Sequence, residues 1–250
     1  MKNLLSIILL FTIITFSSVE AASIKIRVYG MNNTMTYLME VRGNEQLKHD
    51  SAYFSDQMVE YTMDRTMEEG MYRIIFQDSG NPGGEGRFNK GTFRLNFLWL
   101  NENVELETDI SSPVQNMFVH ESSGNRMFYD FLNLRDQFNN KFSVLLEVLE
   151  YYNENSAFYT SLRKEIINVQ KAYADSLLVM TAEDQESFAS LYIRSFQIPV
   201  YAPSEWTSIQ EFLKENYFNH MIMNSEDLLR SDAYSTKIMA YLSLYMQPGY

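Results

Sequence analysis

The sequence contains no cysteine among its 250 residues. Thiol–disulfide exchange, a cysteine nucleophile and thiolate ligands for zinc all require that residue, so these chemistries are excluded. A lipid anchor on an N-terminal cysteine is excluded for the same reason. No pattern in the sequence points to a cofactor or to a bound metal.

Positive charge is also scarce. Twenty lysines and arginines stand against 32 acidic residues, which gives a formal net charge of −12 at pH 7. Binding to nucleic acid or to an anionic membrane surface relies on clustered basic residues, so neither partner is expected. Apolar residues nevertheless make up 46% of the chain. That share is enough for a hydrophobic core and predicts a folded protein.

Long apolar runs are missing except near the N-terminus. Residues 4–16 form an apolar stretch of about 13 residues, too short to cross roughly 30 Å of hydrocarbon as a helix. Lys2 precedes this stretch, and Val19 and Ala21 have the spacing of a signal peptidase site. We therefore expect residues 1–22 to be a signal peptide that is cut after Ala21 or Ala22. The mature chain is expected to be periplasmic, cell-surface or secreted, with no transmembrane segment.

The hydrophobic period of the remaining chain changes near Glu121. Before it, apolar and polar residues mostly alternate, with Ile24, Ile26 and Val28 on one face of the first run. Strands are predicted over 23–30, 35–41, 57–63, 71–76, 92–100, 103–108 and 116–120. Short strands separated by turns predict that residues 23–120 form an antiparallel β-sandwich or a barrel-like sheet.

Residues 121–250 show the period of a helix, because apolar residues recur every three to four positions. Two long helices are predicted over 127–149 and 158–177. Thr181, Ser204 and Asp232 are candidate first residues of three more. The predicted fold class is therefore α+β, with an N-terminal antiparallel β-sandwich followed by an α-helical bundle.

Histidine offers no metal site in this sequence. His49, His120 and His220 are far apart and lack a ligand at the spacing that a helix or strand requires. We expect them to lie on the surface or in loops. The glycine-rich segment 81–86 is followed by a further strand pattern, without the helix and lysine of a phosphate-binding loop. It is therefore predicted to be a hairpin loop.

The serine and acidic residues also have structural interpretations. The segment 122–125 lies where strands give way to helices, and Ser123 or Asn125 is predicted to cap the first helix. Acids are paired as Glu68 with Glu69, Glu183 with Asp184 and Glu186, and Glu226 with Asp227. We favour solvated helix starts for these acids, because the helix dipole attracts negative charge there. The alternative is a glycosidase-type pair across an aromatic cleft.

Aromatic residues are frequent in the C-terminal half. Trp206, Phe212, Tyr217 and Phe218 offer a possible exposed recognition patch. Aromatic residues at helical spacing are usually buried, so packing between helices is the favoured interpretation.

Eight short segments follow one another in a characteristic order along the chain. They are IKIRVYG (24–30), HDSA (49–52), EGMYRI (69–74), FLWL (97–100), VELET (104–108), SGNRMFY (123–129), FLKENYF (212–218) and DLLR (227–230). In this order they resemble the N-terminal accessory region of exported thioredoxin-like proteins of the Bacteroidota. The resemblance covers residues 23–246. Members of that family continue into a thioredoxin domain with a Cys-x-x-Cys motif. Since this sequence has no cysteine, the resemblance implies either a stand-alone relative of the accessory region or a protein that has lost the thioredoxin part.

Together these observations predict an exported, non-catalytic envelope module that binds or positions a protein partner. The resemblance implies a partner linked to redox maintenance or envelope assembly. Two alternatives remain: a carboxylate-based extracytoplasmic hydrolase, and a scaffold remnant of a truncated thioredoxin-like protein. No catalytic, cofactor-binding or metal-binding residue is predicted.

Overall fold

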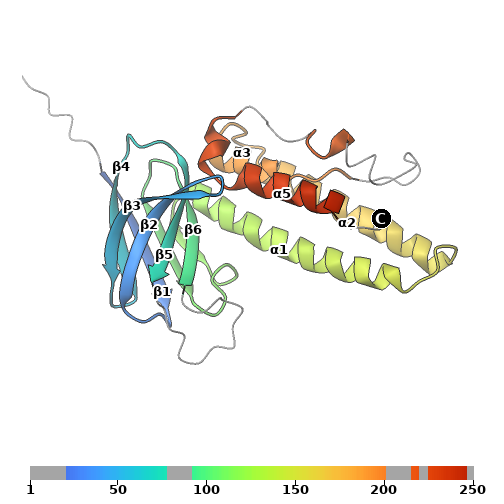
Figure 1. Ribbon diagram of the computed structural model, residues 1–250, viewed down its shortest axis with the longest axis horizontal. Coiled ribbons are helices and arrows are strands. Elements are labelled where there is room, and N and C mark those ends of the chain that lie inside the picture. Colours follow the sequence, from blue (N-terminus) through green and yellow to red (C-terminus); the bar gives the residue numbers. More distant parts are fainter. Residues whose placement is uncertain (1–20, 78–91, 201–214, 220–224, 247–250) are drawn as a thin grey trace, which may run out of the picture.

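The computed structural model describes residues 21–77, 92–200, 215–219 and 225–246, in which eight strands are followed by helices (Figure 1). This order confirms the predicted α+β class. The strands are β1 (Ala21–Tyr29), β2 (Thr34–Arg42), β3 (Glu45–Phe54), β4 (Met58–Asp64), β5 (Gly70–Gln77), β6 (Thr92–Trp99), β7 (Val104–Asp109) and β8 (Phe118–Glu121). The glycine-rich segment 81–86 and the predicted helix start at Ser204 lie outside the described residues.

The strands form two four-stranded sheets, in the orders β4-β1-β7-β8 and β3-β2-β5-β6. Described neighbours are antiparallel except β1 and β7, which run parallel with Ile26 opposite Leu106. The expectation of an entirely antiparallel arrangement was therefore wrong at this pair. Alternation of apolar and polar residues reports which face a side chain occupies but not the direction of the neighbouring strand. A parallel pair requires a long connection, which the intervening strands supply.

Strand β3 was not predicted from the sequence. Its first seven residues are all exposed, so neither face shows an apolar repeat. The pairing of β2 with β3 is irregular between Leu38 and Met39, where His49 is the extra residue. A bulge and the charges of Lys48 and Asp50 on an edge strand discourage pairing with another sheet edge.

The buried side chains of both sheets belong to one hydrophobic core. Ile24, Ile26 and Val28 are fully buried on β1, as the alternation predicted. The rings of Phe54 and Phe76 lie 5.2 Å apart at a steep angle. The same core includes residues of the helices, which are Phe128, Tyr129, Phe131, Tyr173, Leu177, Phe188, Ala189, Leu191, Tyr192, Ile193, Leu228 and Ala233. The sheets and the helical segments that carry these residues are therefore packed as one unit.

The described helices confirm the two long predicted helices. They are α1 (Ser123–Glu150), α2 (Ala157–Met180), α3 (Phe188–Ser195), the 3-10 helix η1 (Asp227–Arg230) and α5 (Ala233–Met246). Helices α1 and α2 contact each other as a long hairpin that projects from the sheets (Figure 1). Among the described helices, none combines the length and the apolar character needed to cross a bilayer.

Three serines cap the first three helices. The hydroxyls of Ser122, Ser156 and Ser187 accept hydrogen bonds from backbone N–H groups in the first turns of α1, α2 and α3. Neither Ser123 nor Asn125 is the cap of α1, so that prediction was wrong by one residue. Thr181 ends α2 instead of starting α3, because its hydroxyl donates to the carbonyl of Leu177. Helix α5 begins directly after Asp232, as predicted.

The side chain of Asn125 ties the first turn of α1 to the edge strand β6. Its Oδ1 accepts from the Leu98 N–H at 2.7 Å, and its Nδ2 donates to the Leu98 carbonyl at 2.7 Å. Asn125 is completely buried. The outer backbone groups of Leu98, which no further strand of the described chain pairs, are therefore satisfied by a helix side chain.

We predict that Asn125→Ala lowers the free energy of unfolding by about 2–4 kcal/mol, because two buried backbone groups lose their partner. Urea denaturation followed by circular dichroism measures the change. Asn139→Ala on the exposed face of the same helix is the matched control and should change stability by less than about 0.5 kcal/mol. Equal effects of the two substitutions would contradict the assigned role.

Lys237 of α5 is a buried cation. It is 5% exposed, its ammonium donates to the carbonyl of Gln197, and it lies 4.6 Å from the centroid of the Tyr217 ring. Burial lowers the pKa of Lys237 to about 8. The folded protein thus carries this positive charge at pH 7 in an unfavourable environment.

Lys237→Met should raise the free energy of unfolding at pH 7 by about 1–3 kcal/mol, since each unit of pKa depression corresponds to about 1.4 kcal/mol. Because the folded-state pKa lies below the usual 10.5, wild-type stability should increase as the pH rises from about 8 to about 10. The difference between the two proteins should shrink over this range. Urea denaturation at several pH values measures it, and a constant difference would show that Lys237 does not titrate as described.

Candidate binding pocket at the sheet–helix junction

Acidic residues from two of the three groups seen in the sequence meet Glu102, which sequence reasoning did not single out, where the sheets join the helices. Glu69 precedes β5, Glu102 lies between β6 and β7, and Glu183 and Asp184 lie between α2 and α3. Their side chains line one pocket of about 570 Å³, which we call the junction pocket. The rest of its lining comes from Leu100, the first two turns of α1, the end of α2 and the start of α3.

The placement of these acids corrects part of the sequence interpretation. Glu183 and Asp184 do precede a helix, and Oδ1 of Asp184 accepts from the N–H of Ser187 at 3.2 Å. Glu68 and Glu69, in contrast, precede a strand, so no helix dipole explains them. Their neighbours are residues far away in the sequence.

Glycine at position 124 allows α1 to begin against the turn after β6. A Cβ atom at Gly124 would lie 2.0 Å from Cδ1 of Leu100. Any larger residue would have to displace Leu100 or move the helix start. The close approach holds one wall of the junction pocket against the other.

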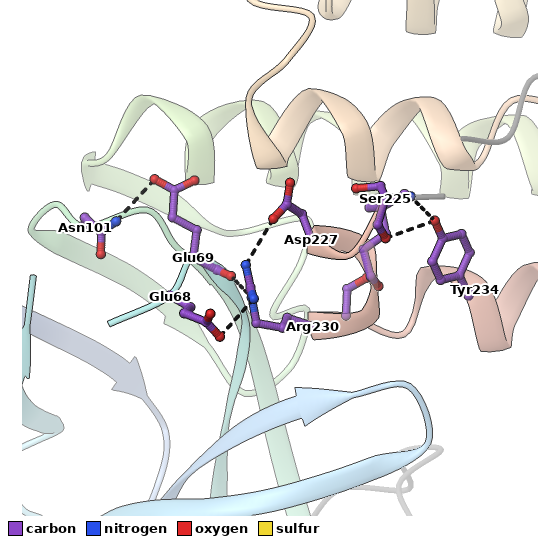
Figure 2. A network of polar contacts seen from close by, with 9 residues as sticks. Glu68, Glu69, Asn101, Ser225, Asp227, Arg230 and Tyr234 are labelled. Carbon is purple, nitrogen blue, oxygen red and sulfur yellow. Dashed lines mark hydrogen bonds and ion pairs between the residues drawn. The ribbon is translucent and has the colours of Figure 1, made fainter. Parts of the chain in front are cut away.

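Arg230 of η1 joins the third acid pair to this region. Figure 2 shows its guanidinium between Glu68, Glu69 and Asp227. Its Nε donates to the Glu69 carbonyl at 2.6 Å, Nη1 lies 2.9 Å from Oε2 of Glu68, and Nη2 donates to Oδ1 of Asp227 at 3.1 Å. A Cβ atom on Gly70 would lie 3.0 Å from Cβ of Arg230, so the 3-10 helix packs directly on the start of β5.

Three buried polar atoms at the pocket have no hydrogen-bond partner among the described residues. They are Oγ of Ser190, Oε1 of Glu102 and Oδ1 of Asn101. Ser190 is 1% exposed and lines the pocket, as does Glu102. Asn101 lies beside them and donates its amide to Oε1 of Glu69 at 3.3 Å (Figure 2). Buried polar atoms rarely lack partners, but each of these three exposes less than 1 Å², so none of them is open to a ligand in the pocket.

The acids also affect one another's protonation. Partial burial raises the pKa of Glu69, and the charges of Asp227 and Glu102 raise it further. The hydrogen bond from Asn101 and the charge of Arg230 act in the opposite direction. A positive charge placed in the pocket would favour the ionised form of Glu69.

The other candidate residues show no shared site. His49 and His120 are both exposed, as expected, and His120 Nε2 lies 3.2 Å from Oε2 of Glu107. His220 lies outside the described residues. Within the described residues, no group of three or more histidines or acids is arranged to hold a metal ion.

The proposed aromatic patch is partly accounted for by packing. Tyr217 and Phe218 contact the ring of Tyr241 on α5, with centroids 5.2 and 4.7 Å apart. This agrees with the interpretation that these aromatic residues pack between helical segments. Trp206 and Phe212 lie outside the described residues.

Arg230, Asn101 and Ser190 were not singled out by sequence reasoning. Arg230 and Glu69 are separated by 161 positions. Arg230 stands in the DLLR segment of the resemblance, which assigned it no role, and Asn101 and Ser190 belong to none of the quoted segments. The acid pairs were the only signal, since each pair of like charges requires solvent or a cationic partner. Their convergence became visible only with the packing of η1 and α3.

We predict that Arg230→Lys lowers the free energy of unfolding by about 1–3 kcal/mol. Lysine keeps the charge but cannot serve three acceptors with the fixed geometry of a guanidinium. Arg42→Lys is the control, because Arg42 contacts Glu40 at 2.7 Å from a half-exposed position where such a pair contributes little. Urea denaturation compares the two, and similar small losses would rule out a structural role for Arg230.

Comparison with known proteins adds no relative. No protein-family model matches the chain, and no curated protein matches it with significance.

Proposed function

We propose that the protein is an exported, non-catalytic module that binds a protein partner in the cell envelope, and that the junction pocket is the binding site. The observation that supports the proposal is the convergence of Glu69, Glu102, Glu183 and Asp184 on one pocket. The described residues form no catalytic arrangement around this polar pocket. A pocket of this kind suits the recognition of a partner.

An exposed apolar residue on one of the elements around the pocket favours a protein over a small molecule as the partner. Val179, in the last turn of α2 and next to the pocket residue Met180, is 75% exposed. Apolar side chains beside a polar pocket are what a protein surface covers on binding.

The hydrolase alternative receives less support from the pocket. A glycosidase site pairs its two carboxyl groups with aromatic platforms for the sugar. Among the residues that the structure describes, no aromatic side chain lines the junction pocket. We therefore keep binding as the proposed function.

Export is part of the proposal. Ala22 is 1% exposed and pairs with Met63 of β4. Of the two expected signal peptidase sites, a cut after Ala21 keeps this buried residue in the sheet, and we favour it. We also infer that the two sheets form a β-sandwich and the helices a small bundle, as the hydrophobic periods of the sequence predict.

The proposal predicts a partner that is lost when the rim of the pocket is changed. The mature chain, immobilised, is incubated with an envelope extract of the source cells, and the captured proteins are quantified. Val179→Arg should reduce capture of one specific protein at least roughly tenfold, because a bulky charge replaces an exposed contact residue. Val144→Arg is the matched control, since Val144 is 58% exposed on the other helix of the same hairpin.

Capture of that protein by the wild type and by Val144→Arg but not by Val179→Arg is the expected result. Equal capture by all three chains, or no protein retained above a bare-matrix background, would overturn the proposal. Circular dichroism of the variants checks that each is folded.

A further inference from the structure

Two arginines are neighbours on the outer face of the sheet β3-β2-β5-β6. Asn96 of β6 is the register partner of Arg73 on β5, and Arg94 lies two residues before Asn96 on the same strand. Ile74 and Leu95, which alternate with them, are buried in the core. Arg73 and Arg94 therefore share the opposite face as diagonal neighbours, within reach of each other's long side chains.

A pocket of about 220 Å³, which we call the arginine pocket, lies beside these two residues. Its lining consists of Arg73, Arg94, Leu95 and Asn96 from the sheet, Pro113 and Val114 from the connection between β7 and β8, and Tyr129 and Leu132 from α1. It shares no lining residue with the junction pocket, and no acid is among the described residues that line it. In a chain with a net charge of −12, two guanidinium groups thus face a pocket that supplies no carboxylate.

The donors of this pocket are unsatisfied and accessible. Neither arginine forms an ion pair with a residue that the structure describes. Nε of Arg73 donates to Oδ1 of Asn96 at 2.6 Å, which leaves both Nη groups of Arg73 and Nδ2 of Asn96 as further donors. These donor atoms are not among the described polar atoms that are fully buried without a partner. They can therefore reach a ligand.

The environment of Arg73 favours an added negative charge. Burial lowers the pKa of Arg73, the charge of Asp232 acts in the opposite direction, and the charge of Arg94 lowers the pKa further. Asp232 lines a different pocket, and its Oδ1 accepts a hydrogen bond from the hydroxyl of Tyr192 at 3.1 Å. An anion between the two guanidinium groups would offset their mutual repulsion.

The size and the walls of the pocket narrow the class of anion. Pockets for drug-sized ligands measure about 300–1,000 Å³, so a pocket of about 220 Å³ suits one side chain or a small organic acid. Pro113, Val114 and Leu132 offer apolar walls, which methylene groups can cover and inorganic phosphate cannot. A carboxylate matches the guanidinium fork with two parallel hydrogen bonds.

We propose that the arginine pocket binds a carboxylate group carried on a short aliphatic chain, as in the side chain of glutamate. The carboxylate oxygens accept from Arg73, Arg94 and the amide of Asn96, and the methylene groups contact the apolar walls. This is a second site, and it stands whether or not the junction pocket binds a partner.

Small probes test the site directly. The ¹⁵N-labelled mature chain is titrated with Nα-acetyl-glutamate methylamide, its neutral glutamine analogue, butyrate and inorganic phosphate. The backbone N–H signals of Asn96 and Val114 report on the pocket, because both residues line it. The two carboxylates should shift these signals in a saturable way that salt weakens, and the glutamine analogue should not.

The two carboxylate probes also distinguish the sources of the ligand. Tighter binding of the glutamate analogue than of butyrate assigns the site to an acidic side chain of a peptide or protein. Tighter binding of butyrate assigns it to a free organic acid.

Variants separate the pocket from the general charge of the surface. Arg94→Gln removes one guanidinium and should weaken binding of the carboxylates roughly fivefold or more. Arg42→Gln is the matched control, because both residues are exposed arginines on strands of the same sheet and Arg42 does not line the pocket. Its affinity should remain within about twofold of the wild type, since charges that do not touch the ligand are screened by salt.

Four results would overturn the proposal. They are equal shifts with the glutamate and glutamine analogues, no saturable shift with either carboxylate, binding of inorganic phosphate at least as tight as that of the carboxylates, and equal binding by Arg94→Gln and Arg42→Gln. Circular dichroism of both variants checks that each is folded.

Discussion

The contact on which the rest of the structure depends is the pair of hydrogen bonds between Asn125 and the backbone of Leu98. Strand β6 is the last strand of its sheet, so its outer N–H and carbonyl groups need partners from elsewhere. A buried amide side chain supplies both a donor and an acceptor, and it does so from the first turn of a helix. The direction in which α1 leaves the sheets is therefore set by backbone hydrogen bonding as well as by apolar packing.

The junction pocket follows from this arrangement. With α1 held at the edge of β6, Gly124 packs against Leu100, and α3 contacts α1. The connection between α2 and α3 then lies opposite the turn after β6, which brings Glu183 and Asp184 to the same pocket as Glu102. Arg230 closes the other side of the junction by holding η1 against the start of β5. Like charges are tolerated here because helix termini and Arg230 partly offset them.

Sequence reasoning identified the elements that have a regular apolar period. The alternation on β1 and the four-residue steps of α1 and α2 each reflect a buried face, and such faces repeat visibly in the chain. Strand β3 was missed because its first seven residues are exposed on both faces. The parallel pairing of β1 with β7 was missed because alternation carries no information on strand direction.

The candidate site was only half visible in the sequence. Acid pairs such as Glu68 with Glu69 were recognisable as unusual, but their partner Arg230 is 161 positions from Glu69. Ser190 belongs to an ordinary helical turn, and the sequence does not show that its hydroxyl is buried without a partner. Contacts of this kind depend on tertiary packing, for which a single sequence has no periodic signal.

The central claim is that the sheets and the helices form one cooperative unit held at this junction. It is tested most directly by urea unfolding of a Trp206→Phe chain, in which the fluorescence of the buried Trp99 reports on the sheets and the ellipticity at 222 nm reports on the helices. One unit requires the two transitions to coincide in midpoint and slope. Midpoints separated by more than about 0.5 M urea would show that the two regions unfold independently and would contradict the account.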